Sequence, residues 1–206
     1  MRPDEIEGES FRIILGELGA DAPSGPRLPI VQRVIHATAD FDFAQHLVFS
    51  PTAIEDAVAA LRAGHPVVTD VTMSASGMSR RHLATLGSRV VCGVHEPETA
   101  ALARADGITR SSAAIRRLAP DLDGSVVAIG NAPTALREVL RLAANGVRPA
   151  VVVGVPVGFV DAAESKDALA ATDLAWITCL GRKGGSTVAA AIVNALLRLA
   201  TESTGA

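Results

Sequence analysis

The chain has 206 residues, of which 49% are hydrophobic, and its mean hydropathy is +0.32. That is enough apolar material for the core of one domain, which we expect to span residues 1–206. A net charge of -3 argues against a nucleic-acid-binding surface, and no apolar run approaches the ~18 residues that a membrane span needs. The N-terminus is acidic and lacks the apolar centre of a signal peptide, so we expect a cytoplasmic protein.

The basic residues are nearly all arginine, with only two lysines, Lys166 and Lys183. Arginine suits the bidentate binding of carboxylates, although a GC-rich genome would also enrich it together with alanine and glycine. Lys183 lies in a glycine-containing segment between predicted elements, and Lys166 lies at the start of a predicted helix that follows another such segment. Cys92 and Cys179 each lie within an apolar run, which favours buried thiols over a disulfide or a metal pair.

Two helices are predicted before the first strand. The apolar residues of segment 4–18 fall on one helical face, and after a loop at 23–29 a second helix begins at Pro29. His36 follows the buried face of this second helix, and the spacing alone leaves open whether it is structural or functional. Asp40, four residues later, is placed to pair with His36 across one helical turn.

Helices then alternate with strands. Ser50 and Pro51 predict the N-cap of a helix at 52–63, and we expect the small residues of 72–79 to form a loop that is either flexible or close to a ligand. Arg110 lies in the first turn of a later helix, where a positive charge opposes the helix dipole, so a specific task for Arg110 is favoured. Other helices are predicted from Arg80 and at 97–105, 109–118, 164–171 and 186–201.

Continuous runs of Val and Ile predict parallel strands that are buried on both faces. Two such runs, 126–129 and 150–153, flank a helix and form one βαβ unit. Three further strands are predicted, at 66–70, 89–94 and 174–180. The predicted fold class is therefore α/β, a doubly wound, mostly parallel sheet of about five strands with helices on both faces. Gly130 and Gly154 should lie at the same edge of this sheet, where such folds bind ligands.

The glycine-rich turns at this edge do not match the nucleotide-binding motifs. The segment 181–187, GRKGGST, combines helix N-terminal amides with two cations, which suits an anion, but its lysine precedes the glycine pair, unlike that of a P-loop. The turn at 130–135, GNAPTA, lacks G-x-G-x-x-G and carries Pro133 where a dinucleotide fold approaches pyrophosphate. The residues also contain no nucleophile elbow and no His/Cys ligand cluster, so a small anionic ligand is the favoured interpretation.

Three long strings of the chain are distinctive, namely VVAIGNAPTAL, GVPVGFVDAAESKDAL and GRKGGSTVAAAIVNAL. Shorter distinctive strings lie upstream, namely ESFRII, VIHAT, LVFSP, SGMSR and TRSSAA. Together these strings resemble the precorrin-8X methylmutase family of cobalamin biosynthesis. Because these strings run from Glu9 to the last helix, the resemblance covers nearly the whole chain.

The resemblance implies an isomerase that moves a methyl group from C-11 to C-12 of a tetrapyrrole, converting precorrin-8X to hydrogenobyrinic acid or its cobalt form. It implies no separate cofactor, no metal held by the protein, and a homodimer with the site near its interface. His36 matches the catalytic histidine, which would protonate the macrocycle. The positions expected to contact the anionic, polycarboxylate substrate are Ser10, Ser79, Arg80, Arg110, Asn131, Lys166, Gly184, Gly185 and Ser186.

Two other functional classes are consistent with an α/β fold of this kind. A tetrapyrrole-binding carrier or scaffold would keep the fold without the chemistry, and the presence of His36 argues against it. A nucleotide-binding enzyme would need the phosphate-loop spacing that the glycine turns lack.

Overall fold

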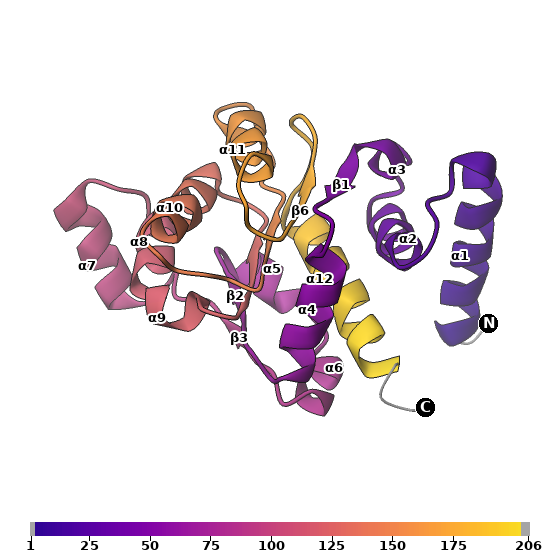
Figure 1. Cartoon of the computed structure of the whole chain (residues 1–206), viewed down its shortest axis with the longest axis horizontal. Helices are drawn as coiled ribbons and strands as arrows, with labels where there is room; N and C mark the ends of the chain where they lie inside the picture. The colour runs from indigo at the N-terminus through magenta and orange to yellow at the C-terminus, as the bar shows by residue number, and fades with distance from the viewer. Residues whose placement is uncertain (1–2, 203–206) are drawn as a thin grey trace.

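The computed structural model describes residues 3–202, and its centre is a mostly parallel sheet with the strand order β1-β6-β5-β4-β2-β3 (Figure 1). Only β1 runs antiparallel to its neighbour within this sheet of six described strands. The strands are β1 (Leu47–Phe49), β2 (Val67–Thr69), β3 (Val90–Val91), β4 (Val126–Ile129), β5 (Val151–Gly154) and β6 (Trp176–Cys179).

Side chains alternate between the two faces of the sheet, and each face is covered by helices. In β4, Val126 and Ala128 belong to one apolar cluster, whereas Val127 and Ile129 belong to the other. Helices α2 (Arg27–Thr38), α4 (Ala53–Arg62) and α12 (Ser186–Glu202) contribute to the first cluster, and α8 (Arg110–Arg117) and α10 (Pro133–Ala144) to the second. Because β4 and β5 are buried on both sides, their sequences are continuous runs of apolar residues, mostly Val and Ile.

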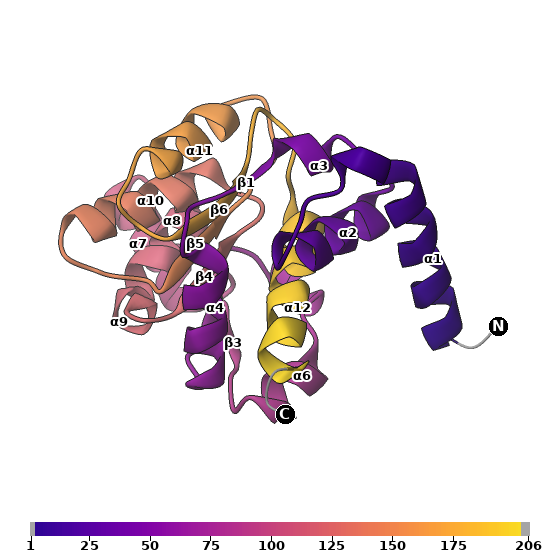
Figure 2. The same cartoon turned by 45° about the vertical axis from the view of Figure 1, so that its right-hand side comes forward.

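The other helices complete these two layers. On the α12 side are α1 (Pro3–Leu18), α3 (Phe43–His46), α5 (Thr72–Ser76) and α6 (Arg80–Thr85), with a short 3-10 turn at Gly19–Asp21. On the α10 side are α7 (Pro97–Asp106), α9 (Ala119–Leu122) and α11 (Ala162–Ala170). Helix α1 packs on α2 at the outside of the molecule, away from the sheet (Figure 2).

The topology confirms the predicted doubly wound class. After β3 the chain returns to the other side of β2, so the strand order reverses between β2 and β4. Ile129 pairs with Gly154 in the parallel β4–β5 ladder, which places Gly130 and Gly154 at the same edge, as predicted. Among the described residues, no helix has the length and apolar character needed to cross a membrane.

The structure differs from the sequence predictions in several details. The sheet has a sixth strand, β1, because three residues at an edge give too short an apolar pattern to be recognised. The predicted loop at 72–79 contains the short helix α5, and the second helix begins at Arg27, two residues before Pro29. Cys179 is buried as predicted, but Cys92 is only partly buried.

Ser50 does not cap a helix. Helix α4 begins at Ala53 with Thr52 at its N-cap, where no side-chain hydrogen bond is made. The Ser50 hydroxyl accepts a hydrogen bond from the backbone N–H of Trp176 at 2.8 Å, and the Ser50 N–H donates to the Trp176 carbonyl at 2.9 Å. Ser50 therefore extends the β1–β6 pairing instead of starting the helix.

Glu138 of α10 holds α8 against α10, and it generates a prediction about acid stability. Its side chain is 5% exposed and binds Arg116 at 2.8 Å and Arg141 at 2.6 Å. Burial raises the pKa of Glu138, but the hydrogen bonds and charges of Arg141 and Arg116 outweigh burial and lower the pKa to about 2. The folded state therefore binds this proton less readily than the unfolded chain does.

We expect the stabilisation from Glu138 to be complete above about pH 4.5 and to disappear as the pH falls through about 2. Glu138→Gln should lower the free energy of unfolding at pH 7 by on the order of 2–3 kcal/mol and weaken its acid dependence, as measured by urea unfolding. Asp173→Asn is the matched control, because Asp173 is 80% exposed in its pair with Arg148 and exposed pairs contribute little. Equal losses in the two variants would contradict this account.

Candidate functional site

The candidate site begins at a histidine and a serine on the outer pair of helices. His36 lies in the last full turn of α2, and its Nδ1 lies 2.7 Å from the hydroxyl oxygen of Ser10 on α1. The Phe11 ring meets the imidazole edge to face, with 5.5 Å between ring centroids. These contacts fix the ring by its Nδ1 side, and no hydrogen bond from the described residues reaches Nε2. The exposed imidazole can therefore exchange a proton with a ligand through Nε2.

A cavity of about 360 Å³ lies beside this pair, between α1 and α2. Most of its wall is apolar, and two carboxylates of α1 line it together with Ser10 and His36. The apolar lining residues are Ile6, Ile13, Ile14, Ile35, Ala39 and Phe41. Such a wall suits the flat, apolar face of a large ligand, with the imidazole as the proton-exchanging group at its edge.

The predicted pair between His36 and Asp40 does not form. Helix α2 ends at Thr38, and Ala39 adopts a left-handed conformation with φ of 53°, which takes Asp40 off the helical face. The Asp40 carboxylate instead accepts a hydrogen bond from the ammonium of Lys183 at 2.6 Å, and Lys183 also binds Asp42 at 2.7 Å. The hydrogen bond from Lys183 lowers the pKa of Asp40. The end of α2 is thus attached to the loop that follows β6.

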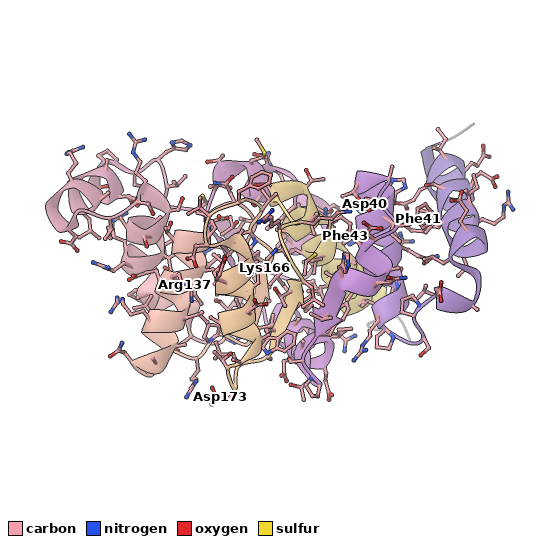
Figure 3. The ribbon with its side chains drawn as sticks, turned by 90° about the horizontal axis from the view of Figure 1, so that it is seen from above. Asp40, Phe41, Phe43, Arg137, Lys166 and Asp173 are labelled. Atoms are coloured by element: carbon pink, nitrogen blue, oxygen red, sulfur yellow. The ribbon has the colours of Figure 1, made fainter. Side chains whose placement is uncertain are left out.

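Lys166 lies in helix α11 near the middle of the molecule, as seen from above in Figure 3. It is only 1% exposed, and its ammonium donates a hydrogen bond to the backbone carbonyl of Lys183 at 2.7 Å. Burial lowers the pKa of Lys166. Gly184 passes so close to the Val155 carbonyl, with φ of 149°, that a side chain there would collide with it. Lys166 therefore lies close to the predicted site residues Gly184, Gly185 and Ser186. Its ammonium contacts the loop that carries them and is not exposed to solvent.

The turn at 130–132 binds a buried carboxylate of the protein itself, a contact that the sequence did not predict. Asp70, which follows β2, is 0% exposed, and its carboxylate accepts hydrogen bonds from the backbone N–H groups of Gly130, Asn131 and Ala132. Burial raises the pKa of Asp70, and these three donors oppose that shift. The turn was predicted to rim the ligand site, yet its amides are occupied by the protein itself. The sequence does contain a signal for this contact. An acidic residue directly after one buried strand can bind the amides of the turn that follows the neighbouring strand.

Arg110 and Asn131 lie on neighbouring helix starts at the same edge. Thr109 caps α8, because its hydroxyl accepts a hydrogen bond from the Ser112 N–H at 3.2 Å. The same hydroxyl lies 2.8 Å from that of Thr134 on α10. This contact holds the N-terminus of α8 next to the turn that carries Asn131. Arg110 and Asn131 are both exposed, so both can reach a ligand.

Ser79 and Arg80 form a separate group at the start of α6. The Ser79 N–H donates a hydrogen bond to the Asn194 side chain of α12 at 2.8 Å, and Ser79 lines a cavity of about 630 Å³ with Arg33 and Arg198. Arg80 lines another cavity, of about 490 Å³. Within residues 5–202, no hydrogen bond joins this group to Ser10 and His36, and no cluster of three His, Cys, Asp or Glu side chains that could hold a metal is found.

Comparison with known proteins agrees with this fold. The family model described as precorrin-8X methylmutase matches residues 5–199. The cobalt-precorrin-8 methylmutase of Salmonella typhimurium (strain LT2) is 46% identical over 204 residues, covering 95% of both chains. The precorrin-8X methylmutase of a Sinorhizobium species is 43% identical over 196 residues, 94% of this chain and 93% of the relative.

A solved structure described as precorrin-8X methylmutase from Thermus thermophilus is also similar. It matches with a TM-score of 0.91 at 42% sequence identity, and the alignment covers 97% of both chains. A family model that spans most of the chain, relatives above 40% identity and a shared fold all point to the same group of proteins. The chain belongs to the precorrin-8X methylmutase family.

Proposed function

We propose that this protein is an isomerase that moves a methyl group from C-11 to C-12 of precorrin-8X or of its cobalt form, giving hydrogenobyrinic acid or cobyrinic acid. The observation that carries this proposal is the Ser10–His36 pair at 2.7 Å beside an apolar cavity. Membership of the methylmutase family supports it. Relatives named for the cobalt and the cobalt-free substrate have similar identities, 46% and 43%, so identity does not select between the two.

His36 supplies the proton in the proposed mechanism. Its ring donates a proton to the macrocycle, the methyl group migrates with its bonding electrons to the adjacent carbon, and the proton then returns to the imidazole. No atom is gained or lost, so the reaction needs a proton donor and a cavity that holds the reacting conformation. Ser10 orients the ring through Nδ1, which leaves Nε2 as the donor.

Arginines and backbone amides would bind the carboxylates around the macrocycle. Arg110 and Arg80 are exposed and have no ion-pair partner in the described part of the chain, so their charges are available to the substrate. The Asn131 side chain and the loop at Gly184 and Ser186 would add uncharged donors. Gly185 would shape this loop, because its N–H already donates to the Val155 carbonyl at 2.8 Å. We propose that the buried Lys166 supports this loop through its hydrogen bond to the Lys183 carbonyl.

We also propose a homodimer in which one site takes residues from both chains. Helix α1 exposes Ile6, Ile13 and Leu15 by 53%, 45% and 44%. Ile6 and Ile13 line the His36 cavity, whereas Leu15 lies on the opposite side of the helix and has no such place. Ser79 and Arg80 make no described contact with the His36 group of their own chain. A second chain packed against α1 would cover Leu15 and bring a further α6 to the site.

The role of His36 is tested by His36→Ala. The exposed imidazole is not part of the core, so the variant should fold and bind the macrocycle, while the single-turnover rate falls by about 10²–10⁴-fold. Thermal melting, ligand-induced absorption change and single-turnover rate together separate this outcome from loss of folding. A stable variant with the wild-type rate would contradict the catalytic role, and a wild-type protein that binds without turnover would indicate a carrier.

The role of Arg110 is tested by Arg110→Ala. An arginine that holds a peripheral carboxylate binds ground state and transition state alike, so the dissociation constant should rise roughly tenfold to a hundredfold while the rate at saturation stays nearly unchanged. Arg104→Ala is the matched control, because Arg104 is an exposed arginine on the neighbouring α7. Equal dissociation constants for Arg110→Ala and wild type would show that Arg110 is a surface residue only.

Subunit complementation tests the shared site. His36→Ala removes the proton donor and Arg80→Ala weakens substrate binding, so each damages one part of the site. At a substrate concentration below KM, a mixture of the two impaired proteins, after subunit exchange, should regain activity through mixed dimers with one intact site. Each variant mixed with itself is the control, and sedimentation velocity reports the dimer directly. A mixture that stays inactive although subunits exchange would show that each site is built within one chain.

A further inference from the structure

The Asp70 carboxylate occupies the place where many doubly wound proteins bind the anionic group of a ligand. The strand order reverses between β2 and β4, and ligands of such folds bind in the crevice at this reversal, often with an anion at the following helix N-terminus. Here Asp70 follows β2, and the turn after β4 leads directly into α10, a helix of 12 residues with Pro133 at its start.

Three consecutive backbone donors converge on this one carboxylate. The N–H of Gly130 donates to Oδ1 at 3.1 Å, and the N–H groups of Asn131 and Ala132 donate to Oδ2 at 2.9 Å and 2.7 Å. Hydrogen bonds to a charged acceptor are stronger than neutral ones, and loss of the carboxylate would leave buried donors without a partner. The turn therefore has its present conformation because an anion is built into it.

The turn is also packed from the opposite side. A side chain at Gly130 would lie 2.8 Å from the Cα of Ser186 and 2.9 Å from the hydroxyl of Ser74, so the turn abuts the first residue of α12. Asn131 alone of the three donor residues is exposed at the sheet edge. Movement of this turn would displace Asn131 and disturb the Ser186 end of the glycine loop together.

We propose that Asp70 is a positioning residue that serves as a built-in anion: it fixes the turn at 130–132 and so presents Asn131 to the substrate. This inference rests on the proposed function in one respect only, the contact between Asn131 and the substrate. The binding of the Asp70 carboxylate by the turn is a property of the free protein and needs no substrate. It also explains why this fold does not offer its strand-reversal crevice to a phosphate or nucleotide.

Chemical rescue tests the built-in anion without any substrate. Asp70→Gly leaves the three donors facing an empty, carboxylate-sized space, so the variant should melt several degrees below wild type, and formate should restore the melting temperature in a saturable manner. Wild type in formate, and the variant in chloride at equal ionic strength, should show no such rise. A variant that formate does not stabilise, or one that fails to fold even in formate, would overturn the proposal.

A double-mutant cycle tests positioning. Asp70→Asn keeps the shape of the side chain but removes the charge, and together with Asn131→Ala it should show coupling: each single change raises KM roughly two- to tenfold with kcat nearly unchanged, and the double variant resembles Asn131→Ala alone. A lower melting temperature with unchanged KM in Asp70→Asn, or additive effects on KM, would show that Asp70 is structural only. Successful rescue in a protein without isomerase activity would leave the built-in anion standing and reject the proposed function instead.

Discussion

Burial of β4 and β5 on both faces is the constraint on which the rest of this structure depends. Every residue of Val126–Ile129 and of Val151–Val153 is 0% exposed, so helices must cover both sides and the neighbouring strands must satisfy all backbone N–H and C=O groups. In β4 and β5, polar groups are then confined to the strand ends. The glycine turns after β4 and β5, and Asp70 after β2, lie at the same edge for this reason.

The chemistry proposed for this protein lies away from the usual ligand crevice of its fold. Asp70 fills the crevice between β2 and β4, whereas His36 belongs to the outer helix pair α1 and α2. Lys183 connects the end of α2 to α11, because its ammonium binds Asp40 and Asp42 and its carbonyl accepts a hydrogen bond from Lys166. A large macrocycle is suited to such an arrangement, because its apolar centre and its distant carboxylates require contacts spread over a wide surface.

The sequence was informative where a local pattern has a single structural meaning. Continuous valines predicted β4 and β5, and Gly107 ended α7 in the left-handed conformation that favours glycine. The family strings identified the group of proteins, and the comparisons confirm it. The roles of the individual site residues rest on these strings and remain predictions. Helical spacing alone left open whether His36 is structural or functional.

What the sequence did not predict depends on residues far apart in the chain. Lys183 and Asp40 are separated by 143 positions, and Asp70 and Asn131 by 61, so no periodicity or motif reports either contact. Asp40 was assigned to His36 because helical spacing was assumed to continue, whereas Ala39 ends the helix first. The edge strand β1 was missed for a related reason, because its pairing with β6 depends on the tertiary fold more than on its three residues.

The central claim, that this chain binds and isomerises a corrin precursor, is tested most directly by titrating it with hydrogenobyrinic acid and with its cobalt analogue while following visible absorption. The account predicts a saturable spectral change at one macrocycle per chain with at least one of the two products. Absence of any spectral change with both products, in a folded protein, would contradict it.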